Sequence, residues 1–244
     1  MNSSQTGTEG GVDKQPIYIS ESDVAGLDLT ATQCCEVMRE VFSAQAADET
    51  VALPATHLDI APGRGFRSLC AAWPAAGLAG NKWFGVRPTQ PGDRGSGVQA
   101  LYLLNDYVTG SPLAIISANQ LTGLRTAAMS ALVLQALQVT QCQTIGFIGC
   151  GLQASFHLKL IHSLVPALTN VRCYSRTRKS AEIVAAQATS SGLASEVCQL
   201  PEDAVKSSQI VVSSIPLSSE LVPFLDPGWI QPGSILLAVD LARP

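Results

Sequence analysis

Residues 149–154 have the spacing Gly-x-Gly-x-x-Ala, and they are Gly149, Cys150, Gly151, Leu152, Gln153 and Ala154. In such a loop the first glycine permits a tight turn, the second lets the backbone approach a diphosphate, and the small last residue lets a helix pack on the preceding strand. The N-terminus of that helix then faces the anion. The hexapeptide is weak evidence by itself, but it lies between an apolar strand-like run at 144–148 and a helical segment at 152–165. We therefore predict a dinucleotide-binding loop.

The residues after the next strand-like run, 171–174, indicate which dinucleotide this loop would bind. They are Ser175, Arg176, Thr177 and Arg178. A site for NAD usually has a carboxylate here that holds the ribose 2′-hydroxyl, and this segment has none. Two guanidinium groups and two hydroxyls could instead hold a 2′-phosphate. We predict NADP as the cofactor, with NAD as the alternative if the arginines simply point into solvent.

A third candidate loop, Ser214 and Ile215, follows the apolar run at 209–213. Doubly wound sheets bind ligands beyond the C-terminal ends of their strands. We predict that this loop lines the adenosine or nicotinamide side of the cofactor, with an ordinary connecting loop as the open alternative.

The histidines do not indicate a metal site. His157 and His162 are five residues apart in one helical segment, which places them on different faces, and His57 lies far away in the sequence. We predict no bound metal. The chain also lacks a Gly-x-Ser-x-Gly nucleophile elbow, which argues against a hydrolase of that type.

The elements that must position these loops follow an α/β pattern after residue 121. Near-continuous apolar runs alternate with helical segments of about 12 residues, which is typical of a parallel sheet covered on both faces. The predicted strands are 144–148, 171–174, 209–213 and 234–239, and the predicted helices are 152–165 and 179–190. This half of the chain is predicted to be a Rossmann-type domain.

The first half has a different pattern, typical of an α+β domain. Ser20 and Asp23 match a helix capping pattern, and 27–46 has helical periodicity. Short strand-like runs separated by Pro and Gly follow between 51 and 106, and 99–104 should form a hairpin with 113–117. A helix at 121–137 is expected to be capped by Thr122. We predict a disordered tail at 1–16 and two domains, at 17–120 and 121–244.

Composition limits the classes of protein that fit. The 244 residues carry a net charge of −4, and their Lys and Arg are scattered, which gives no reason to expect a nucleic-acid partner. The apolar runs are far shorter than the ~18–20 residues of a membrane helix. The N-terminus has no apolar signal region, and seven cysteines without a Cys-x-x-Cys pair suggest buried free thiols. The expected location is therefore the cytosol.

Several motifs together resemble the ornithine cyclodeaminase/mu-crystallin family. The resemblance is carried by Leu-Thr-Gly-Leu-Arg-Thr-Ala-Ala at 121–128, by Gly-Phe-Ile-Gly-Cys-Gly-Leu-Gln-Ala at 146–154, and by Trp-Ile-Gln-Pro-Gly-Ser at 229–234. Weaker matches are Gly-Asn-Lys-Trp at 80–83 and Leu-Asn-Asp at 104–106. The resemblance implies an enzyme that uses NAD or NADP and acts on an amino acid or its imine. It also implies a homodimer formed through the first domain, which would hold the substrate.

The resemblance also implies roles for single residues. Lys82 matches the family lysine that contacts substrate beside the nicotinamide, where a buried ammonium could hold a carboxylate or take part in proton transfer. Arg125, followed by Thr126, matches an arginine at a helix start that faces the substrate carboxylate or the cofactor diphosphate. Without the resemblance, Lys82 would be an ordinary strand-end charge and Arg125 a helix-surface residue.

The chain departs from the family pattern at several positions. Many members have a Pro-x-Arg arginine that grips the substrate, and the comparable stretch at 54–57 has none; a family threonine near the cofactor is replaced by Gly97. The aspartate that handles the departing amine in cyclodeaminases aligns with Ala242, although Asp240 lies two residues earlier and could approach the site from a strand end. Arg243-Pro244 resembles the reductase and dehydrogenase branch.

Family members also continue beyond the position that matches Pro244. We therefore expect either a fragment or a chain that has lost its C-terminus, with an unpaired sheet edge.

Three functions remain open at this point. The first is an NADP-dependent ketimine reductase or amino-acid dehydrogenase, with Lys82, Arg125 and Asp240 as candidate catalytic residues. The second is a cyclodeaminase that releases ammonia and recycles bound NAD. The third is a protein that binds NADP without catalysis.

Overall fold

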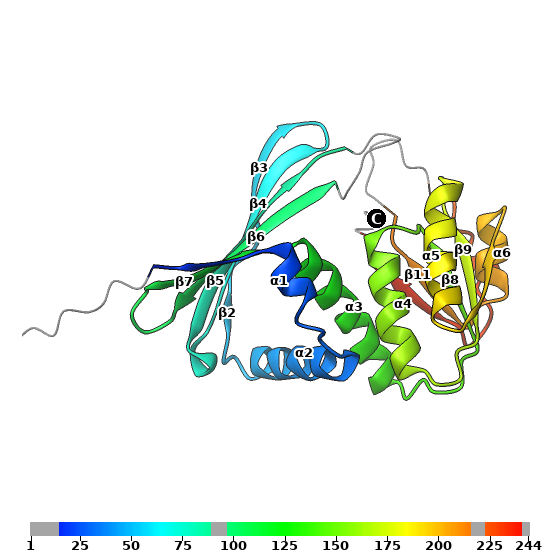
Figure 1. The fold of residues 1–244 in the computed structure, drawn as a ribbon, viewed down its shortest axis with the longest axis horizontal. Helices are drawn as coiled ribbons and strands as arrows, with labels where there is room; N and C mark the ends of the chain where they lie inside the picture. The colour runs from blue at the N-terminus through cyan, green and yellow to red at the C-terminus, as the bar shows by residue number, and fades with distance from the viewer. Residues whose placement is uncertain (1–14, 89–96, 216–222, 241–244) are drawn as a thin grey trace, which may run out of the picture.

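The computed structural model describes residues 15–88, 97–215 and 223–240 (Figure 1). These residues form two β-sheets, with helices packed between them (Figure 1). Most of the predicted tail at 1–16, and the positions 242–244 used to compare reductase and cyclodeaminase branches, lie outside the described residues.

The first sheet has seven strands, which are β1 (Ile17–Ile19), β2 (Val51–Ala52), β3 (Thr56–Ala61), β4 (Arg64–Trp73), β5 (Leu78–Val86), β6 (Val98–Asp106) and β7 (Pro112–Ser117). Their order is β1-β7-β6-β5-β4-β2, and β3 pairs with β4 outside this path. Only the β1–β7 pairing is parallel. A short 3-10 helix, Pro74–Ala76, connects β4 to β5. The predicted hairpin is confirmed, because β6 and β7 are antiparallel neighbours.

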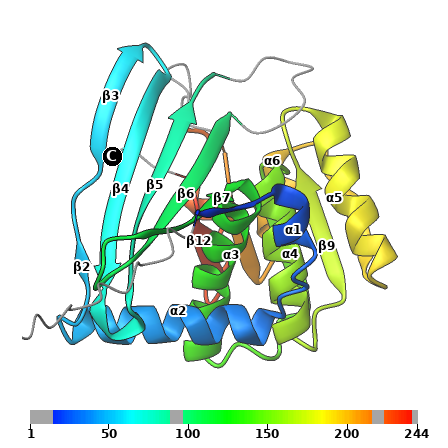
Figure 2. The same ribbon diagram turned by 60° about the vertical axis from the view of Figure 1, so that its left-hand side comes forward.

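Three helices accompany this sheet: α1 (Glu21–Ala25), α2 (Ala31–Ala46) and α3 (Asn119–Ala136). In Figures 1 and 2 they lie on one side of the sheet, and no helix of the described residues covers its other side. Helix α2 begins later than predicted, because Thr30 caps it and accepts a hydrogen bond from the Gln33 backbone N–H at 3.2 Å. The capping of α1 by Ser20 with Asp23 is as predicted.

The start of α3 is held by an acidic side chain from another helix. Both carboxylate oxygens of Glu21 accept hydrogen bonds from the first backbone N–H groups of α3, at Asn119 (2.8 Å) and Gln120 (3.0 Å). These N–H groups have no partner within the helix, and a negative charge there also interacts favourably with the helix dipole. The prediction that Thr122 caps this helix is therefore wrong. Thr122 lies inside the first turn, and its buried hydroxyl has no hydrogen-bond partner.

The second sheet has five strands, which are β8 (Thr144–Ile148), β9 (Asn170–Tyr174), β10 (Ala194–Val197), β11 (Ile210–Ser213) and β12 (Ile235–Ala238). All neighbours are parallel, in the order β10-β9-β8-β11-β12. One face packs against α4 (Leu152–Leu164) and α5 (Arg178–Ser190), and the other against α6 (Pro201–Lys206) and a 3-10 helix, Pro227–Trp229. The predicted fold class, a Rossmann-type parallel sheet preceded by an α+β half, is confirmed. Strand β10 and helix α6 were not predicted.

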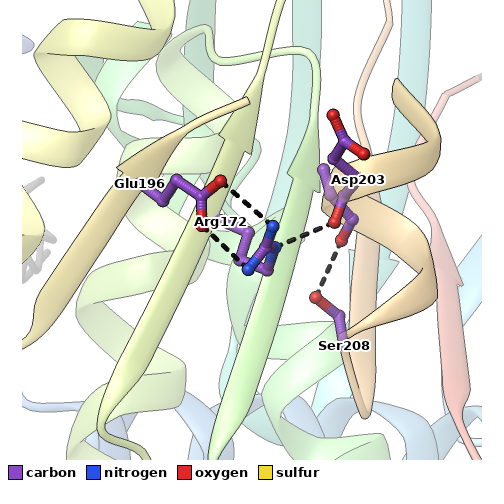
Figure 3. Close-up of polar contacts among 5 residues, drawn as sticks. Arg172, Glu196, Asp203 and Ser208 are labelled. Carbon is purple, nitrogen blue, oxygen red and sulfur yellow. Dashed lines mark hydrogen bonds and ion pairs between the residues drawn. The ribbon is translucent and has the colours of Figure 1, made fainter. Parts of the chain in front are cut away.

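Arg172 joins three elements of the second half (Figure 3). It lies in β9, its Nε donates to the backbone carbonyl of Asp203 in α6 at 2.8 Å, and its two terminal nitrogens contact the carboxylate of Glu196 in β10 at 2.8 and 3.1 Å. A bidentate pair of this kind also fixes orientation. Gly146, in β8, lies against α6 as well, because a Cβ there would be 2.0 Å from the carbonyl oxygen of Ala204.

Helices α2, α3 and α4 share one apolar core between the two sheets, made of Ala31, Cys34, Cys35, Ala127, Ala128, Ala131 and Leu160. Helix α3 packs against both α2 and α4, so it takes part in the packing of both halves of the chain. The division into two domains at residue 120 stays a prediction. All seven cysteines are free; five are buried as predicted, but Cys70 is exposed and Cys142 only partly buried. No helix in the described part of the chain combines the length and apolar character needed to cross a membrane.

Candidate active site

The predicted cofactor loops meet at one edge of the parallel sheet. Ile148, at the end of β8, is level with Tyr174 of β9 and with Ser213 of β11. The loops that follow these strands are therefore neighbours. Gly149 donates its N–H to the Tyr174 carbonyl at 2.9 Å, and the Ser214 hydroxyl donates to the Gly149 carbonyl at 2.9 Å. The structure thus brings together the glycine loop, 175–178 and 214–215.

The glycine loop has the geometry that its sequence predicts. Gly149 has a φ of +86°, and a Cβ there would lie 2.8 Å from the carbonyl oxygen of Ser214, so this position requires glycine. Gly151 has an extended backbone, and a Cβ there would meet nothing within 4 Å. Ala154 is fully buried against the sheet. Space therefore exists above Gly151 for a group that approaches the backbone.

The N-terminus of α4 offers hydrogen-bond donors to such a group. The helix has 13 residues, and no side chain caps its first turn, so the first N–H groups of the helix remain available to an anion. One buried polar atom in the first turn of α4, Oε1 of Gln153, also has no hydrogen-bond partner. Because buried polar atoms are usually satisfied, this residue fits a polar ligand such as a dinucleotide.

The residues predicted to select NADP lie between β9 and α5. Thr177 occupies the N-cap position of α5 without a side-chain hydrogen bond, and Ser175 is partly buried. Arg178 forms an exposed ion pair with Glu182 at 3.0 Å, so its charge is partly compensated. Arg176 is exposed, and no carboxylate of the described residues pairs with it. The two arginines therefore differ in their availability to a phosphate.

Lys82 is a buried cation on the first sheet. It is only 6% exposed, and its ammonium lies 4.7 Å from the ring centre of Phe84 and 6.0 Å from that of Tyr102. Burial, and secondly the positive charge of Arg125, lowers the pKa of Lys82 from 10.5 to about 8. No carboxylate of the described residues forms an ion pair with it.

Arg125, in α3, carries the positive charge that contributes to the lowered pKa of Lys82. It lies in the second turn of this helix, not at its first residue, and is exposed, with a contact from Nη1 to the Met129 sulfur at 3.5 Å. The hydroxyl of its neighbour Thr126 donates to the backbone carbonyl of Thr122 at 2.8 Å, so this hydroxyl is already hydrogen-bonded within the helix. A buried lysine that is influenced by a second positive charge, and that no acid of the described residues pairs with, is suited to binding a carboxylate.

Asp240 lies at the C-terminal end of β12, at the same edge as the cofactor loops. Its carboxylate accepts a hydrogen bond from the hydroxyl of Ser213, and the backbone N–H of Ile215 lies 3.5 Å away. These contacts join the ends of β11 and β12. Asp240 is not among the groups that perturb Lys82. Its catalytic role stays a prediction.

Sequence reasoning missed the aromatic residues around Lys82. Tyr102 is its direct neighbour on β6, and Phe84 lies two residues further along β5. Strand alternation could have placed Phe84 on the same face as Lys82, but the register that brings Tyr102 opposite Lys82 depends on the pairing of β5 with β6.

Comparison with known proteins identifies the family. The model of the ornithine cyclodeaminase/mu-crystallin family matches residues 16–244, so the chain belongs to this family, as predicted. Members of the family are NAD(P)-dependent oxidoreductases or cyclodeaminases.

Among individual relatives, the chain is 25% identical to alanine dehydrogenase of Archaeoglobus fulgidus, over 94% of this chain and 68% of that protein. It is 31% identical to the ketimine reductase mu-crystallin of Mus musculus, over 60% of this chain and 44% of that protein. The Thermococcus litoralis Δ1-pyrroline-2-carboxylate reductase, solved with NADH and L-proline, has a TM-score of 0.81 at 21% identity, over 90% of this chain and 67% of that one. The chain thus spans between 44% and 68% of the length of these relatives.

Replacing Gly151 by alanine should weaken dinucleotide binding without loss of stability. The new Cβ meets no protein atom, but it enters the space that a diphosphate needs. We expect the Kd for NADH to rise about tenfold or more, with an unchanged midpoint of urea unfolding.

Gly149→Ala is the contrasting variant, because its positive φ and its contact with Ser214 should lower stability by about 1–3 kcal/mol. Gly26→Ala, in a right-handed helical conformation away from this edge, serves as the control. An unchanged Kd for Gly151→Ala would contradict the assignment of this loop.

Proposed function

We propose that the protein is an NADP-dependent oxidoreductase that acts on an amino acid or its imine, as a ketimine reductase or an amino-acid dehydrogenase. The observation that carries this proposal is the buried Lys82, whose pKa is lowered by burial and by the charge of Arg125 on α3, the helix that packs against α4 of the glycine loop. Gly123, two residues before Arg125, is the point of contact with α4, since a Cβ there would lie 2.4 Å from the ring of Phe156. This packing of α3 against α4 supports placing the proposed carboxylate site in the same half of the molecule that faces the glycine loop.

In this proposal, Lys82 and Arg125 bind and orient the substrate carboxylate. When bound, the nicotinamide supplies a hydride donor or acceptor for the carbon that carries nitrogen. A lysine with a pKa of about 8 is mainly protonated at neutral pH, and it can also give a proton to a substrate nitrogen or take one from it. Orientation and electrostatics are thus the main contribution of these residues.

The preference for NADP rests on Arg176. Its guanidinium follows β9 and lacks a carboxylate partner among the described residues, whereas Arg178 is paired with Glu182. The end of β9 also has no acidic residue for a ribose 2′-hydroxyl. Related structures contain NAD or NADH, so NAD is the competing cofactor.

Replacing Arg176 by alanine should raise the Kd for NADPH about tenfold or more, because one charge-assisted hydrogen bond to the 2′-phosphate is lost. The Kd for NADH should not change. Arg178→Ala is the matched control, and a smaller effect is expected because Glu182 already compensates its charge. If Arg176→Ala weakened the binding of NADPH and NADH equally, as measured by fluorescence titration, the result would argue against selection of NADP by Arg176.

Two other functions compete with this proposal. A cyclodeaminase is favoured by the placement of Asp240 at the cofactor edge, although its carboxylate is engaged by Ser213. A protein that binds NADP without catalysis is the third possibility. One set of assays on the 244-residue chain separates them. Net NADPH oxidation with an α-keto acid and an amine supports the reductase, ammonia release from ornithine without net cofactor change contradicts it, and tight NADPH binding with neither reaction indicates a binding protein.

We also propose that the protein forms a homodimer through the uncovered face of the first sheet. Strand alternation and register place exposed apolar residues on the side opposite Lys82: Leu58, Phe66, Trp83, Leu101 and Leu103. The rings of Phe66 and Trp83 are stacked, with their centres 5.3 Å apart. Apolar patches of this kind mark interaction surfaces. A related archaeal alanine dehydrogenase is a dimer. Sedimentation of the chain as a monomer at micromolar concentration would contradict this proposal.

A further inference from the structure

We propose that Arg67 provides a second point of anion recognition, so that the preferred substrate is an amino or imino acid with a second carboxylate on its side chain. This inference rests on the proposed function, because it takes Lys82 and Arg125 as the site of the first carboxylate.

Arg67 lies on the same face of the first sheet as Lys82. In the pairing of β4 with β5, Leu69 is opposite Lys82 and Arg67 is opposite Phe84. Side chains two residues apart on a strand share a face, so Arg67 and Lys82 both point to the side opposite Trp83. Phe84 is a neighbour of both residues, two positions from Lys82 on β5 and opposite Arg67 on β4, and its ring centre lies 4.7 Å from the Lys82 ammonium. The two cationic residues thus share an apolar neighbour on this face of the sheet.

The guanidinium of Arg67 is held in place, not free in solvent. The side chain is 22% exposed, Nη1 donates to the Phe66 carbonyl at 2.9 Å, and Nη2 contacts the Asp59 carboxylate at 2.6 Å. Gly65 provides the space for it, since a Cβ at that position would lie 2.8 Å from Nη1. An arginine fixed in this way loses little further conformational entropy when it binds an anion.

The acid that pairs with Arg67 is replaceable. The Asp59 side chain is 69% exposed, and ion pairs with an exposed partner contribute little stability. A guanidinium has five N–H donors, and the contacts with Phe66 and Asp59 account for two of its nitrogens. A substrate carboxylate can therefore bind Arg67 by using the remaining donors or by displacing Asp59.

The test compares dicarboxylates with monocarboxylates as ligands of the chain saturated with NADPH. Succinate, glutarate and adipate are titrated against butyrate by calorimetry. We expect the best dicarboxylate to bind about tenfold or more tightly than butyrate. Arg67→Gln should remove this advantage and leave the affinity for butyrate unchanged. Asp59→Asn should increase the advantage, because the competing carboxylate is lost.

Arg64→Gln is the matched control, since Arg64 is an exposed arginine at the start of the same strand. Thermal unfolding of each variant shows whether the fold is retained. Equal affinities of the wild-type chain for dicarboxylates and butyrate would overturn the inference while leaving the proposed function intact. The same weakening of both ligand classes in Arg67→Gln would also overturn it. Binding of NADPH without binding of any carboxylate would contradict the proposed function itself.

Discussion

The burial of the Lys82 ammonium under the influence of a second positive charge is the constraint on which the rest of the site depends. Lys82 is buried, Arg125 adds a second positive charge that lowers its pKa, and no acid of the described residues compensates the buried charge. Left to itself, such a pair would separate or lose a proton. The surrounding structure prevents separation, because Lys82 belongs to a central strand of the first sheet and Arg125 to a helix that is fixed at several points.

Helix α3 is fixed by contacts that also connect it to the cofactor loop. Glu21 holds its N-terminus, and Gly123 allows close contact with Phe156 of α4. Further along, the buried ring of His157 contacts the Ser130 hydroxyl in α3 at 3.0 Å and the Gln153 carbonyl in the first turn of α4 at 2.8 Å. The position of Arg125 and the orientation of the N-terminus of α4 are therefore set by one pair of packed helices. This arrangement keeps an anion-binding pair at a fixed place relative to a dinucleotide.

The parts of this site that could be predicted from sequence are those that depend on local chemistry. The glycine loop needs a positive φ at Gly149 and open space at Gly151, and the apolar run before it and the helix after it are visible in the sequence. The capping of α3 could not be predicted, because Glu21 is about a hundred residues away from Asn119 in the chain. A capping pattern read from sequence considers only nearby residues such as Thr122, and the group that holds this helix end is not among them. Arg67 was missed for a similar reason: its relation to Lys82 depends on the register of β4 and β5.

The most direct test of this account is the pKa of Lys82, measured by NMR titration of its ε-carbon and assigned with Lys82→Met. We expect a pKa of about 8 in the free chain. In Arg125→Met the pKa should rise, because removal of a like charge favours the protonated form, yet burial should still hold it below 10.5. A bound carboxylate should raise it further. A pKa near 10.5 in the wild-type chain, unchanged in Arg125→Met, would contradict the existence of a paired-cation site.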